Sequence, residues 1–508
     1  MFGTVLSAAL KGMHAEFVHV EADTSNGLPM FQMVGYLSSE VKEAKERVRT
    51  AIKNTGITLP PKKTVVNLSP ANVRKRGAAF DLPIAVAILV SQGMLKNERL
   101  EDTVIIGELG LDGEVKGVPG VLPIVLEASK AGCRACIVPE CNAKEGQLVR
   151  EMEVVSVSSL SEVCDYLNYG KILQKEGKSG DEPCKETYAI DYSEVYGQES
   201  VKRAAEVAVA GGHNLLLIGP PGSGKTMIGK RIPTIFPPLS MEESMEITAV
   251  YSIMGLVESQ RPLVRNRPFR EVHHTATRCA LIGGGMTPVP GEMSLADGGV
   301  LFLDELAEFQ KPVLEAMRQP MEEKKVRITR RQETYLFPAD CMIVAAMNPC
   351  PCGNYPDYNR CLCSDHQIQQ YLSGISQPFM DRMDLCAEAP KVEYEKLRGR
   401  GEAEESSVIR ERVCHAREIQ KNRYREEKFL VNAHLGVKEL EKYCVLGKEE
   451  DDLMRKAFAQ YHLTARTYHK VLKTARTIAD LATEERIRAN HLREALSYRA
   501  MDQKYWGR

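Results

Sequence analysis

The chain has 508 residues, of which 43% are hydrophobic and 27% are charged, and its formal net charge is −1. These values are typical of a soluble globular protein with about two to four domains, and they exclude a surface that is basic overall, so any nucleic-acid contact has to be local. No apolar stretch approaches the ~20 residues needed to span a bilayer. The first residues lack the pattern of a secretion signal, and 14 cysteines in such a chain favour reduced thiols. We therefore expect a cytoplasmic protein with no membrane contact.

Residues 1–168 alternate short runs of β-forming residues with helical stretches. The strands are expected at 64–68, 103–109 and 136–140, and the helices at 40–56 and 82–93. The next residues, 169–187, are charged, contain glycines and have almost no periodic apolar spacing, which is typical of a linker. We interpret 1–168 as a separate N-terminal domain.

The chain beyond the linker divides into a βα-rich region, residues 188–392, and a helical region, residues 393–508. The helical pattern is clearest at 406–424 and 466–482, where apolar residues recur at helical spacing. The βα-rich region predicts an α/β fold built on a parallel sheet.

A glycine-rich octapeptide directly follows the apolar run NLLLI (214–218) and matches the pattern GxxxxGK[ST]. It consists of Gly219, Pro220, Pro221, Gly222, Ser223, Gly224, Lys225 and Thr226. Where a buried strand ends in a glycine loop that turns into a helix, backbone N–H groups face the phosphates. In such a loop Lys225 reaches the β- and γ-phosphates and Thr226 ligates Mg²⁺. The sequence therefore predicts a site for ATP and Mg²⁺ rather than a chance glycine loop.

Two further apolar runs end in polar residues. The run 300–305 (VLFLDE) ends in Asp304, which can hold the Mg²⁺ shell, and Glu305, which can polarise an attacking water. The run 341–348 ends in Asn348, a polar residue placed to hydrogen-bond the water or the γ-phosphate. The carboxyl ends of parallel strands meet at one edge of a sheet, so these side chains are expected to lie beside the phosphate loop. The pattern predicts an ATPase.

Five segments together resemble the YifB/ComM family of magnesium-chelatase-like AAA+ ATPases, and the likeness runs through essentially the whole chain. They are GGHNLLLIGPPGSGKT, HHTATRCALIGGGMTPVPGEMSLADGGVLFLDELAEF, AAMNPCPCG, FMDRMDL and TARTYHKVLKTARTIADL. The resemblance implies a P-loop AAA+ core, with helices flanking a parallel sheet, and an all-α C-terminal lid. It also implies a ring, expected to be a homo-hexamer, in the helix-2-insert branch of these ATPases. The glycine-rich segment 273–292 fits an insertion between the phosphate loop and Asp304.

The same resemblance assigns roles by position. Arg382 falls at the arginine finger, which enters the neighbouring subunit's site and is worth roughly 10³–10⁵ in rate; the alternative is a surface Arg–Asp pair. Arg466 matches the sensor 2 arginine. Val195, Tyr196 and Gly197 lie where these ATPases pack the adenine.

The segment 322–337 is expected to form a β-hairpin just before the strand that ends in Asn348. Its basic residues are Arg327, Arg330 and Arg331. They would face a central pore and hold phosphates of a nucleic acid; the alternative is a solvated charged hairpin.

Four cysteines, Cys350, Cys352, Cys361 and Cys363, lie within 14 residues as two C-x-C pairs on either side of a turn. They would surround one Zn²⁺ tetrahedrally, with Zn–S near ~2.3 Å, although C-x₂-C is the commoner spacing. Four cysteine ligands leave no open position, so the metal would be structural. The alternative is four free, reduced cysteines.

Residues 1–168 resemble the proteolytic domain of Lon, which implies an α+β fold like domain 2 of ribosomal protein S5. Ala79 falls where Lon has its nucleophilic serine, and Leu122 where it has its lysine. Without a hydroxyl and an amine there is no activated nucleophile, so we expect a catalytically inactive domain that acts as a scaffold or binds a partner. The alternative is a surviving dyad built from Ser91 and Lys116, which lie near the aligned positions Ala79 and Leu122 in the sequence.

Three functions compete for this ATPase. The first is a DNA motor of the branch-migration or helicase type, related to competence and recombination, and we favour it. The second is a protein remodeller that binds its substrate through the Lon-like domain. The third, a metal-chelatase subunit, is the weakest, because the sequence has nothing that resembles an integrin-like metal-binding domain. DNA binding predicts an affinity that falls with salt, and protein binding does not.

Overall fold

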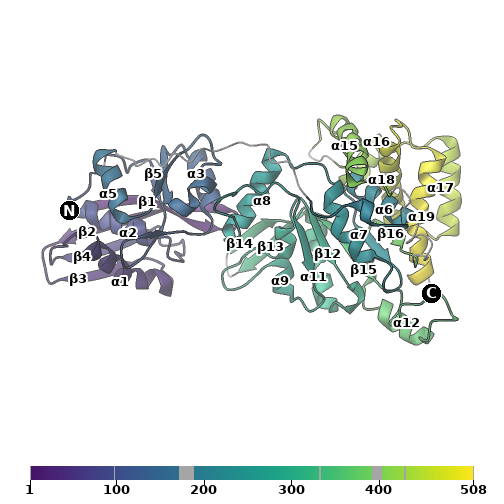
Figure 1. Ribbon diagram of the computed structural model, residues 1–508, viewed down its shortest axis with the longest axis horizontal. Coiled ribbons are helices and arrows are strands. Elements are labelled where there is room, and N and C mark those ends of the chain that lie inside the picture. Colours follow the sequence, from purple (N-terminus) through teal and green to yellow (C-terminus); the bar gives the residue numbers. More distant parts are fainter. Residues whose placement is uncertain are drawn as a thin grey trace. The chain divides into compact units, whose positions relative to one another are not determined.

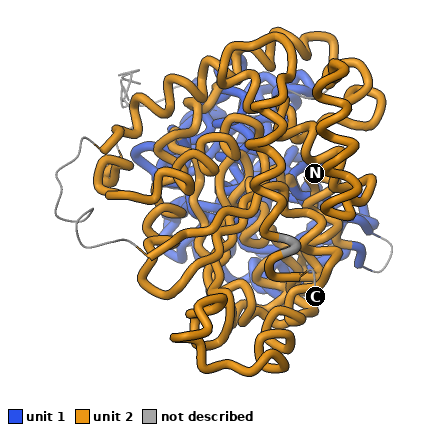
Figure 2. Tube along the Cα trace, turned by 90° about the vertical axis from the view of Figure 1, so that its right-hand side faces the viewer, with its two compact units in different colours: residues 1–184, 241–264, 329–337 blue, residues 185–240, 265–328, 338–508 orange. Residues whose placement is uncertain are grey.

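The computed structural model describes residues 2–96, 98–170, 188–330, 333–391, 403–427 and 431–506 (Figure 1). The chain forms two compact units, which Figure 2 distinguishes by colour. Unit 1 comprises residues 1–184, 241–264 and 329–337, and unit 2 comprises residues 185–240, 265–328 and 338–508. The expected linker 169–187 lies outside the described residues from residue 171 onward.

Unit 1 is built on a seven-stranded sheet in the order β3-β4-β2-β1-β5-β8-β9. Its strands are β1 (Phe2–Lys11), β2 (His14–Ser25), β3 (Met30–Val34), β4 (Lys63–Ser69), β5 (Thr103–Ile105), β8 (Ala135–Pro139) and β9 (Glu153–Val157). β1 and β2 form an antiparallel hairpin that pairs Lys11 with His14. The tight turn between them needs a residue with positive φ, and Gly12 supplies it at +64°.

The helices of this part are α1 (Ser39–Asn54), α2 (Asp81–Ser91), α3 (Val121–Lys130), α4 (Ala143–Gly146) and α5 (Leu160–Tyr169), with a 3₁₀ turn η1 (Glu140–Asn142). α2 is buried along its whole length, which explains why its sequence is apolar on every face. The predicted helices and the strands near 64 and 136 are confirmed to within two residues. The predicted strand 103–109 is instead divided, because β6 (Glu108–Leu109) turns away to pair with β7 (Val115–Lys116).

One helix of the βα-rich region belongs to unit 1. α8 (Met241–Ile253) packs against α3, with the Gly120 N–H donating to the Ser252 carbonyl at 2.9 Å. Ala249 of α8 is buried in the same apolar cluster as Leu122. The segments of the βα-rich region that lie in unit 1 are therefore 241–264 and 329–337, and the glycine-rich 273–292 is not one of them. That segment packs on α11 and β11 inside unit 2.

Unit 2 contains a five-stranded sheet in the order β11-β12-β15-β10-β16, and all the paired strands are parallel. Its strands are β10 (Leu215–Ile218), β11 (Phe269–Val272), β12 (Val300–Leu303), β15 (Met342–Met347) and β16 (Leu385–Glu388). β10, β12 and β15 are buried at every residue, which is why they read as unbroken apolar runs. A two-stranded hairpin, β13 (Lys325–Arg330) and β14 (Glu333–Pro338), precedes β15. It starts later than 322 because Glu322 and Glu323 still belong to α11.

Helices and 3₁₀ turns surround this sheet. They are η2 (Tyr192–Glu194), α6 (Glu199–Gly211), α7 (Lys225–Arg231), η3 (Ile232–Ile235), α9 (Arg278–Ile282), α10 (Glu292–Leu295), η4 (Leu306–Glu308), α11 (Lys311–Glu323), α12 (Asp365–Leu372) and α13 (Gln377–Met380). α6 packs against β10 and β16, and α7 packs against β15.

The described part of the chain from residue 406 onward is helical. It consists of α15 (Ser406–Arg423), η5 (Asn432–His434), α16 (Val437–Tyr443), α17 (Lys448–Gln460), α18 (Ala465–Leu481) and α19 (Ala489–Trp506). The carboxylate of Asp480 is fully buried, and it accepts hydrogen bonds from Arg423, Arg476 and Asn432. These partners compensate the buried charge and tie α15 to α18. Within the described residues, no helix combines the length and the apolar character needed to cross a membrane.

Candidate functional site

The phosphate loop follows β10 and leads into α7. Gly222 and Gly224 have φ values of +75° and +86°, in the region that favours glycine. Gly219 has no space for a side chain, because an added Cβ would lie 2.2 Å from the Ala389 carbonyl oxygen. The glycines of this loop are therefore required by backbone conformation at two positions and by close packing at a third.

Lys225 lies under the loop, and its side chain is buried. Its Nζ donates to the carbonyls of Gly219 at 2.7 Å and Pro220 at 2.9 Å, and to Asn348 Oδ1 at 3.3 Å. Burial lowers the pKa of Lys225 to about 8, and nearby Asp304 opposes that shift. A phosphate bound at this loop would place a negative charge beside the amine and so favour its protonated form.

Thr226 and Asp304 meet where a magnesium ion would be held. Thr226 Oγ1 donates to Asp304 Oδ2 at 2.8 Å. Two adjacent oxygens of an octahedral Mg²⁺ shell, each about 2.1 Å from the metal, lie about 3.0 Å apart. The spacing and the oxygen chemistry of the pair both fit Mg²⁺.

Glu305 adopts an unusual backbone conformation beside this pair. Its φ is +54°, a left-handed conformation that costs a non-glycine residue about 1–3 kcal/mol. Its N–H donates to Asp304 Oδ1 at 2.9 Å. Its carboxylate Oε2 lies 3.0 Å from Nδ1 of His274, which follows β11. His274 was missed by the sequence reasoning, although a pair of histidines directly after a strand was a usable signal.

Lys225, Thr226, Asp304, Glu305 and Asn348 are thus gathered at the carboxyl edge of the parallel sheet. Each follows one of three neighbouring strands, β10, β12 or β15, or opens the helix after it.

The segment expected to pack the adenine reaches the phosphate loop through a neighbouring residue. Val195 is buried, Tyr196 is exposed and Gly197 has a φ of +68°. The next residue, Gln198, donates from Nε2 to the Ser223 carbonyl at 3.0 Å and to the Pro390 carbonyl at 2.5 Å. Gln198 is a second site residue that the sequence reasoning missed.

Arg382 and Arg466 lie together, but away from the phosphate loop. Nη2 of each is 2.6 Å from Oε1 of the same carboxylate, Glu322. The side chain of Arg382 is 9% exposed and that of Arg466 is 44% exposed. The Asn214 side-chain amide donates to the Arg382 carbonyl at 3.0 Å, which places Arg382 where β10 begins. Both arginines are therefore at the amino edge of the sheet, opposite the phosphate loop.

The two arginines line a pocket of about 510 Å³. Lys324, Lys470 and Lys473 line the same pocket, so basic groups outnumber the acidic ones there. Burial lowers the pKa of Lys470 to about 8, against the opposing effect of Asp384, whose carboxylate is 3.4 Å from the Lys470 amine. Among the described residues that line the pocket, none belongs to the phosphate loop. This basic pocket is therefore separate from the phosphate loop.

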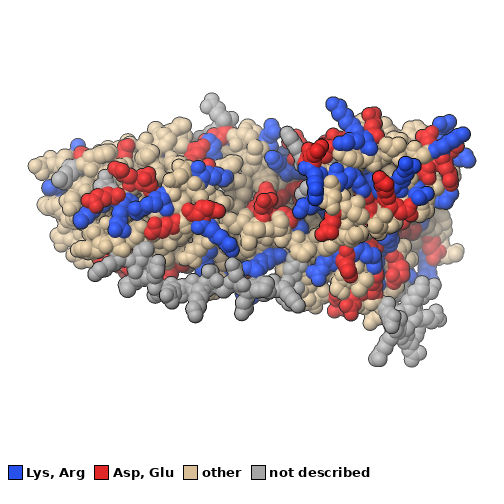
Figure 3. Space-filling view, turned by 90° about the horizontal axis from the view of Figure 1, so that it is seen from above, with Lys and Arg blue, Asp and Glu red and all other residues tan. Residues whose placement is uncertain are grey.

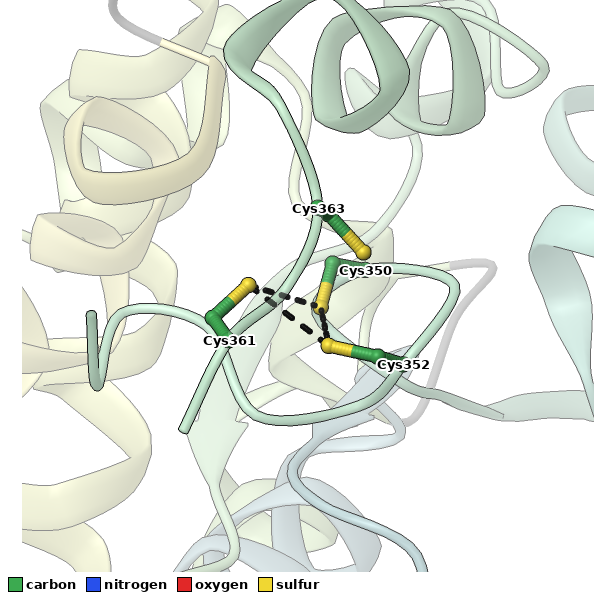
Figure 4. Close-up of side chains that lie close together, drawn as sticks. All are labelled: Cys350, Cys352, Cys361 and Cys363. Atoms are coloured by element: carbon green, nitrogen blue, oxygen red, sulfur yellow. Dashed lines mark hydrogen bonds between the residues drawn. The ribbon is translucent and has the colours of Figure 1, made fainter. Parts of the chain in front are cut away.

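The four cysteines converge, as Figure 4 shows. Cys350 Sγ lies 3.4 Å from Cys352 Sγ and 3.7 Å from Cys361 Sγ, and Cys352 and Cys361 are 3.6 Å apart. All four sulfurs lie within 4.8 Å of one another. A tetrahedral ion with Zn–S bonds of about 2.3 Å places its sulfurs about 3.8 Å apart. The thiols therefore fit one zinc ion.

The environment of these thiols also favours a metal. The Asn354 backbone N–H lowers the pKa of Cys352 to about 6, whereas desolvation raises the pKa of Cys361. Four sulfurs so close together cannot all be ionised without a cation between them. A zinc ion, which binds the thiolate form, would supply such a cation.

The hairpin β13–β14 presents part of its predicted basic surface. The side chains of Arg327 and Arg330 are exposed, and Arg331 lies outside the described residues. Arg327 is 4.0 Å from Glu323, an exposed pair that holds it weakly. On the face of the molecule in Figure 3, basic and acidic side chains are interspersed.

The positions that match the Lon dyad are apolar and packed. Ala79 and Leu122 belong to one hydrophobic cluster in unit 1, together with Met245 and Ala249 of α8. Of the two residues considered as a surviving dyad, Ser91 is buried and shares a hydrogen bond with Thr24 at 2.7 Å, whereas Lys116 is exposed.

A phosphate loop at the carboxyl edge of a parallel sheet, with a carboxylate pair and a polar residue on neighbouring strands, fits the AAA+-type class of P-loop proteins. The comparisons with known proteins give the family. Three family models match: Magnesium chelatase, subunit ChlI, over residues 191–397; Subunit ChlI of Mg-chelatase, over 20–142; and Magnesium chelatase, subunit ChlI C-terminal, over 403–499. The chain belongs to the YifB/ComM family of magnesium-chelatase-like proteins.

The relatives match along nearly their whole length. The chain is 41% identical over 500 residues to the uncharacterized protein YifB of Salmonella typhimurium, covering 98% of this chain and 97% of that one. It is 41% identical over 508 residues to the competence protein ComM of Haemophilus influenzae, with the same coverage. The uncharacterized protein YifB of Escherichia coli is also 41% identical over 508 residues, with the same coverage. Membership of this family suggests ATPase activity.

Proposed function

We propose that this protein is an ATP-hydrolysing motor that assembles into a homo-hexameric ring and acts on DNA. The observation that carries the proposal is the separation of the two halves of an ATPase site. The groups suited to bind ATP lie at the carboxyl edge of the sheet, and Arg382 and Arg466 lie at the amino edge. A ring in which each subunit presents its amino edge to the next subunit's phosphate loop would complete every site.

Each residue has a role in this scheme. The backbone N–H groups of residues 222–226 and the amine of Lys225 hold the phosphates. Thr226 and Asp304 hold Mg²⁺, which neutralises phosphate charge when it is bound. Glu305 accepts a proton from the attacking water, and Asn348 orients that water or the γ-phosphate.

The neighbouring subunit supplies the remaining charge in this scheme. Arg382 acts as the arginine finger, and Arg466 acts beside it as sensor 2, both on the γ-phosphate of the adjacent subunit. Glu322 keeps the two guanidinium groups together until that phosphate arrives.

The remaining regions are assigned as follows in the proposal. Residues 188–392 form the ATPase core, in which Val195, Tyr196 and Gly197 pack the adenine, and residues 393–508 form an all-α lid. Residues 1–168 adopt a fold like domain 2 of ribosomal protein S5 without peptidase activity, and 169–187 link the two parts.

DNA is the favoured substrate because one close relative is a competence protein and because the β13–β14 hairpin exposes basic residues. Arg327 and Arg330 would hold the phosphates of a strand in the ring's pore, as helicase or branch-migration activity requires.

The test is the steady-state ATPase rate with and without single-stranded, duplex and forked DNA, measured across a salt series. Stimulation that fades with salt supports the proposal, because each phosphate contact lowers log K by about 0.7–0.9 per log unit of salt. Arg327→Ala with Arg330→Ala should remove the stimulation and leave the basal rate unchanged. The matched control is Arg455→Ala, an exposed arginine on α17. A rate that no DNA changes, in a protein shown to form hexamers, would contradict a DNA substrate.

A protein substrate is the second candidate. It is favoured by the apolar packing of Ala79 and Leu122, which suits a domain kept for binding rather than for proteolysis. A flat response to DNA combined with stimulation by an unfolded protein would establish this alternative.

We also propose a third cofactor besides ATP and Mg²⁺, a structural Zn²⁺ held by Cys350, Cys352, Cys361 and Cys363. The sulfur spacing supports this proposal. Reduced thiols and a DNA substrate would place the protein in the cytoplasm.

A further inference from the structure

The cysteine loop touches the phosphate loop directly. Gly353, the residue after Cys352, lies against Pro221, and a Cβ added to Gly353 would be 2.3 Å from Pro221 Cδ. Gly353 also has a φ of +79°. Its position thus allows no larger residue, and the two loops are packed without space between them.

A second contact joins the same two segments. Asn348, which lies two residues before Cys350, accepts a hydrogen bond from Lys225 Nζ at 3.3 Å. The short stretch 348–353 therefore meets the phosphate loop at Lys225 and at Pro221. Any movement of this stretch would therefore alter both the hydrogen bond to Lys225 and the packing against Pro221.

The second pair of cysteines is joined to the start of a capped helix. Cys363 directly precedes Ser364, which caps α12 in a reciprocal arrangement with Gln367. A bond between the two pairs would connect the stretch 348–353 to the start of α12. The four sulfurs are close enough for one ion to make that connection.

We propose that a zinc ion bound by the four cysteines clamps the phosphate loop, so that zinc occupancy sets the affinity for nucleotide. The inference deepens the proposed function, since it rests on residues 219–226 being the nucleotide site. Zinc joins the stretch 348–353 to α12 and keeps Asn348 and Gly353 against Lys225 and Pro221. When zinc is removed, this stretch is released, and the phosphate loop loses its packing contact with Gly353 and its hydrogen bond to Asn348.

The experiment uses the full-length protein, without DNA and without turnover. Zinc content is measured by elemental analysis, and affinity is measured with a fluorescent ATP analogue. We expect one zinc per subunit, and after chelation a loss of affinity of about tenfold or more, the effect of losing a hydrogen bond to a charged group. Hydrogen exchange should rise in 219–226 as well as in 348–363.

Two variants separate the metal from the contact it supports. Cys361→Ser removes a ligand of the second cysteine pair and should lower both zinc content and affinity; Cys279→Ser, at an exposed cysteine, is its control. Gly353→Ala keeps all four thiols, so it should retain zinc and still lose affinity. Gly132→Ala is its control, because Gly132 has a similar φ of +78° and nothing within 4 Å of an added Cβ.

The outcomes are distinct. Protein without bound zinc overturns the inference, and so does zinc-loaded protein whose affinity is unchanged by chelation and by Gly353→Ala. If Cys361→Ser fails to fold, Gly353→Ala and chelation of the wild type still decide the matter. Failure of the wild type to bind nucleotide would instead refute the proposed function.

Discussion

The placement of Arg382 at the amino edge of the sheet predicts a specific result for mixed rings. Asn214, which holds Arg382, is separated from Gly219 by the whole of β10. At about 3.3 Å per residue, these five steps span about 16 Å, farther than an arginine side chain extends. Arg382 therefore cannot reach the phosphate loop of its own subunit, and the proposed arginine finger requires that it act on the loop of a neighbour.

The perturbation is a pair of variants, Lys225→Ala and Arg382→Ala. Alone, Arg382→Ala should lower the ATPase rate by roughly 10³–10⁵, equivalent to about 4–7 kcal/mol of transition-state stabilisation, while nucleotide still binds. In a 1:1 mixture, a site is complete when its loop comes from the Arg382→Ala subunit and its arginine from the Lys225→Ala subunit. With random mixing, half of the sites have an intact loop and half of those face an intact arginine. About a quarter of the sites are therefore active.

The assay is the ATPase rate of the co-refolded or subunit-exchanged mixture, with mixed rings verified by native mass spectrometry. Each variant alone sets the background, and wild type sets the maximum. Recovery to about a quarter of the wild-type rate is the expected outcome. A mixture no more active than the variants alone, in verified mixed rings, would refute action between subunits.

Three further predictions concern single residues. Glu305→Gln should lower kcat by about 10²–10⁴ and leave ATP affinity unchanged, whereas Glu308→Gln, three residues further along the chain, should do neither. His274→Ala should lower kcat about tenfold by freeing Glu305. An unchanged kcat in this variant would argue against a role for His274. His213 is fully buried, and burial lowers its pKa to about 4 against an ordinary value of 6.5. Its folded-state pKa lies below its unfolded value, so the associated stability is complete above pH 6.5 and is lost as the pH falls towards 4. Urea unfolding should therefore show a loss of about 2 kcal/mol between about pH 7.5 and 5 that His213→Gln removes, and an equal loss in the variant would contradict this.

Local sequence determined much of the architecture. The helices α15 and α18 begin and end within one residue of the expected 406–424 and 466–482, because apolar periodicity and capping act within a few turns. The gathering of Lys225, Asp304 and Asn348 was also predictable, since parallel strands bring their carboxyl ends to one edge whatever lies between them.

Other features depend on contacts between residues far apart in sequence, and only the tertiary structure decided them. Arg382 and Arg466 were predicted as separate motifs, yet their common partner Glu322 and their place away from the phosphate loop depend on how α18 packs against α6. His274 meets Glu305 because β11 pairs with β12. The departure of 241–264 into unit 1 likewise depends on α8 burying Ala249 against α3. Periodicity reports which face of an element is apolar, but the partner that covers that face is chosen by the packing of the whole chain.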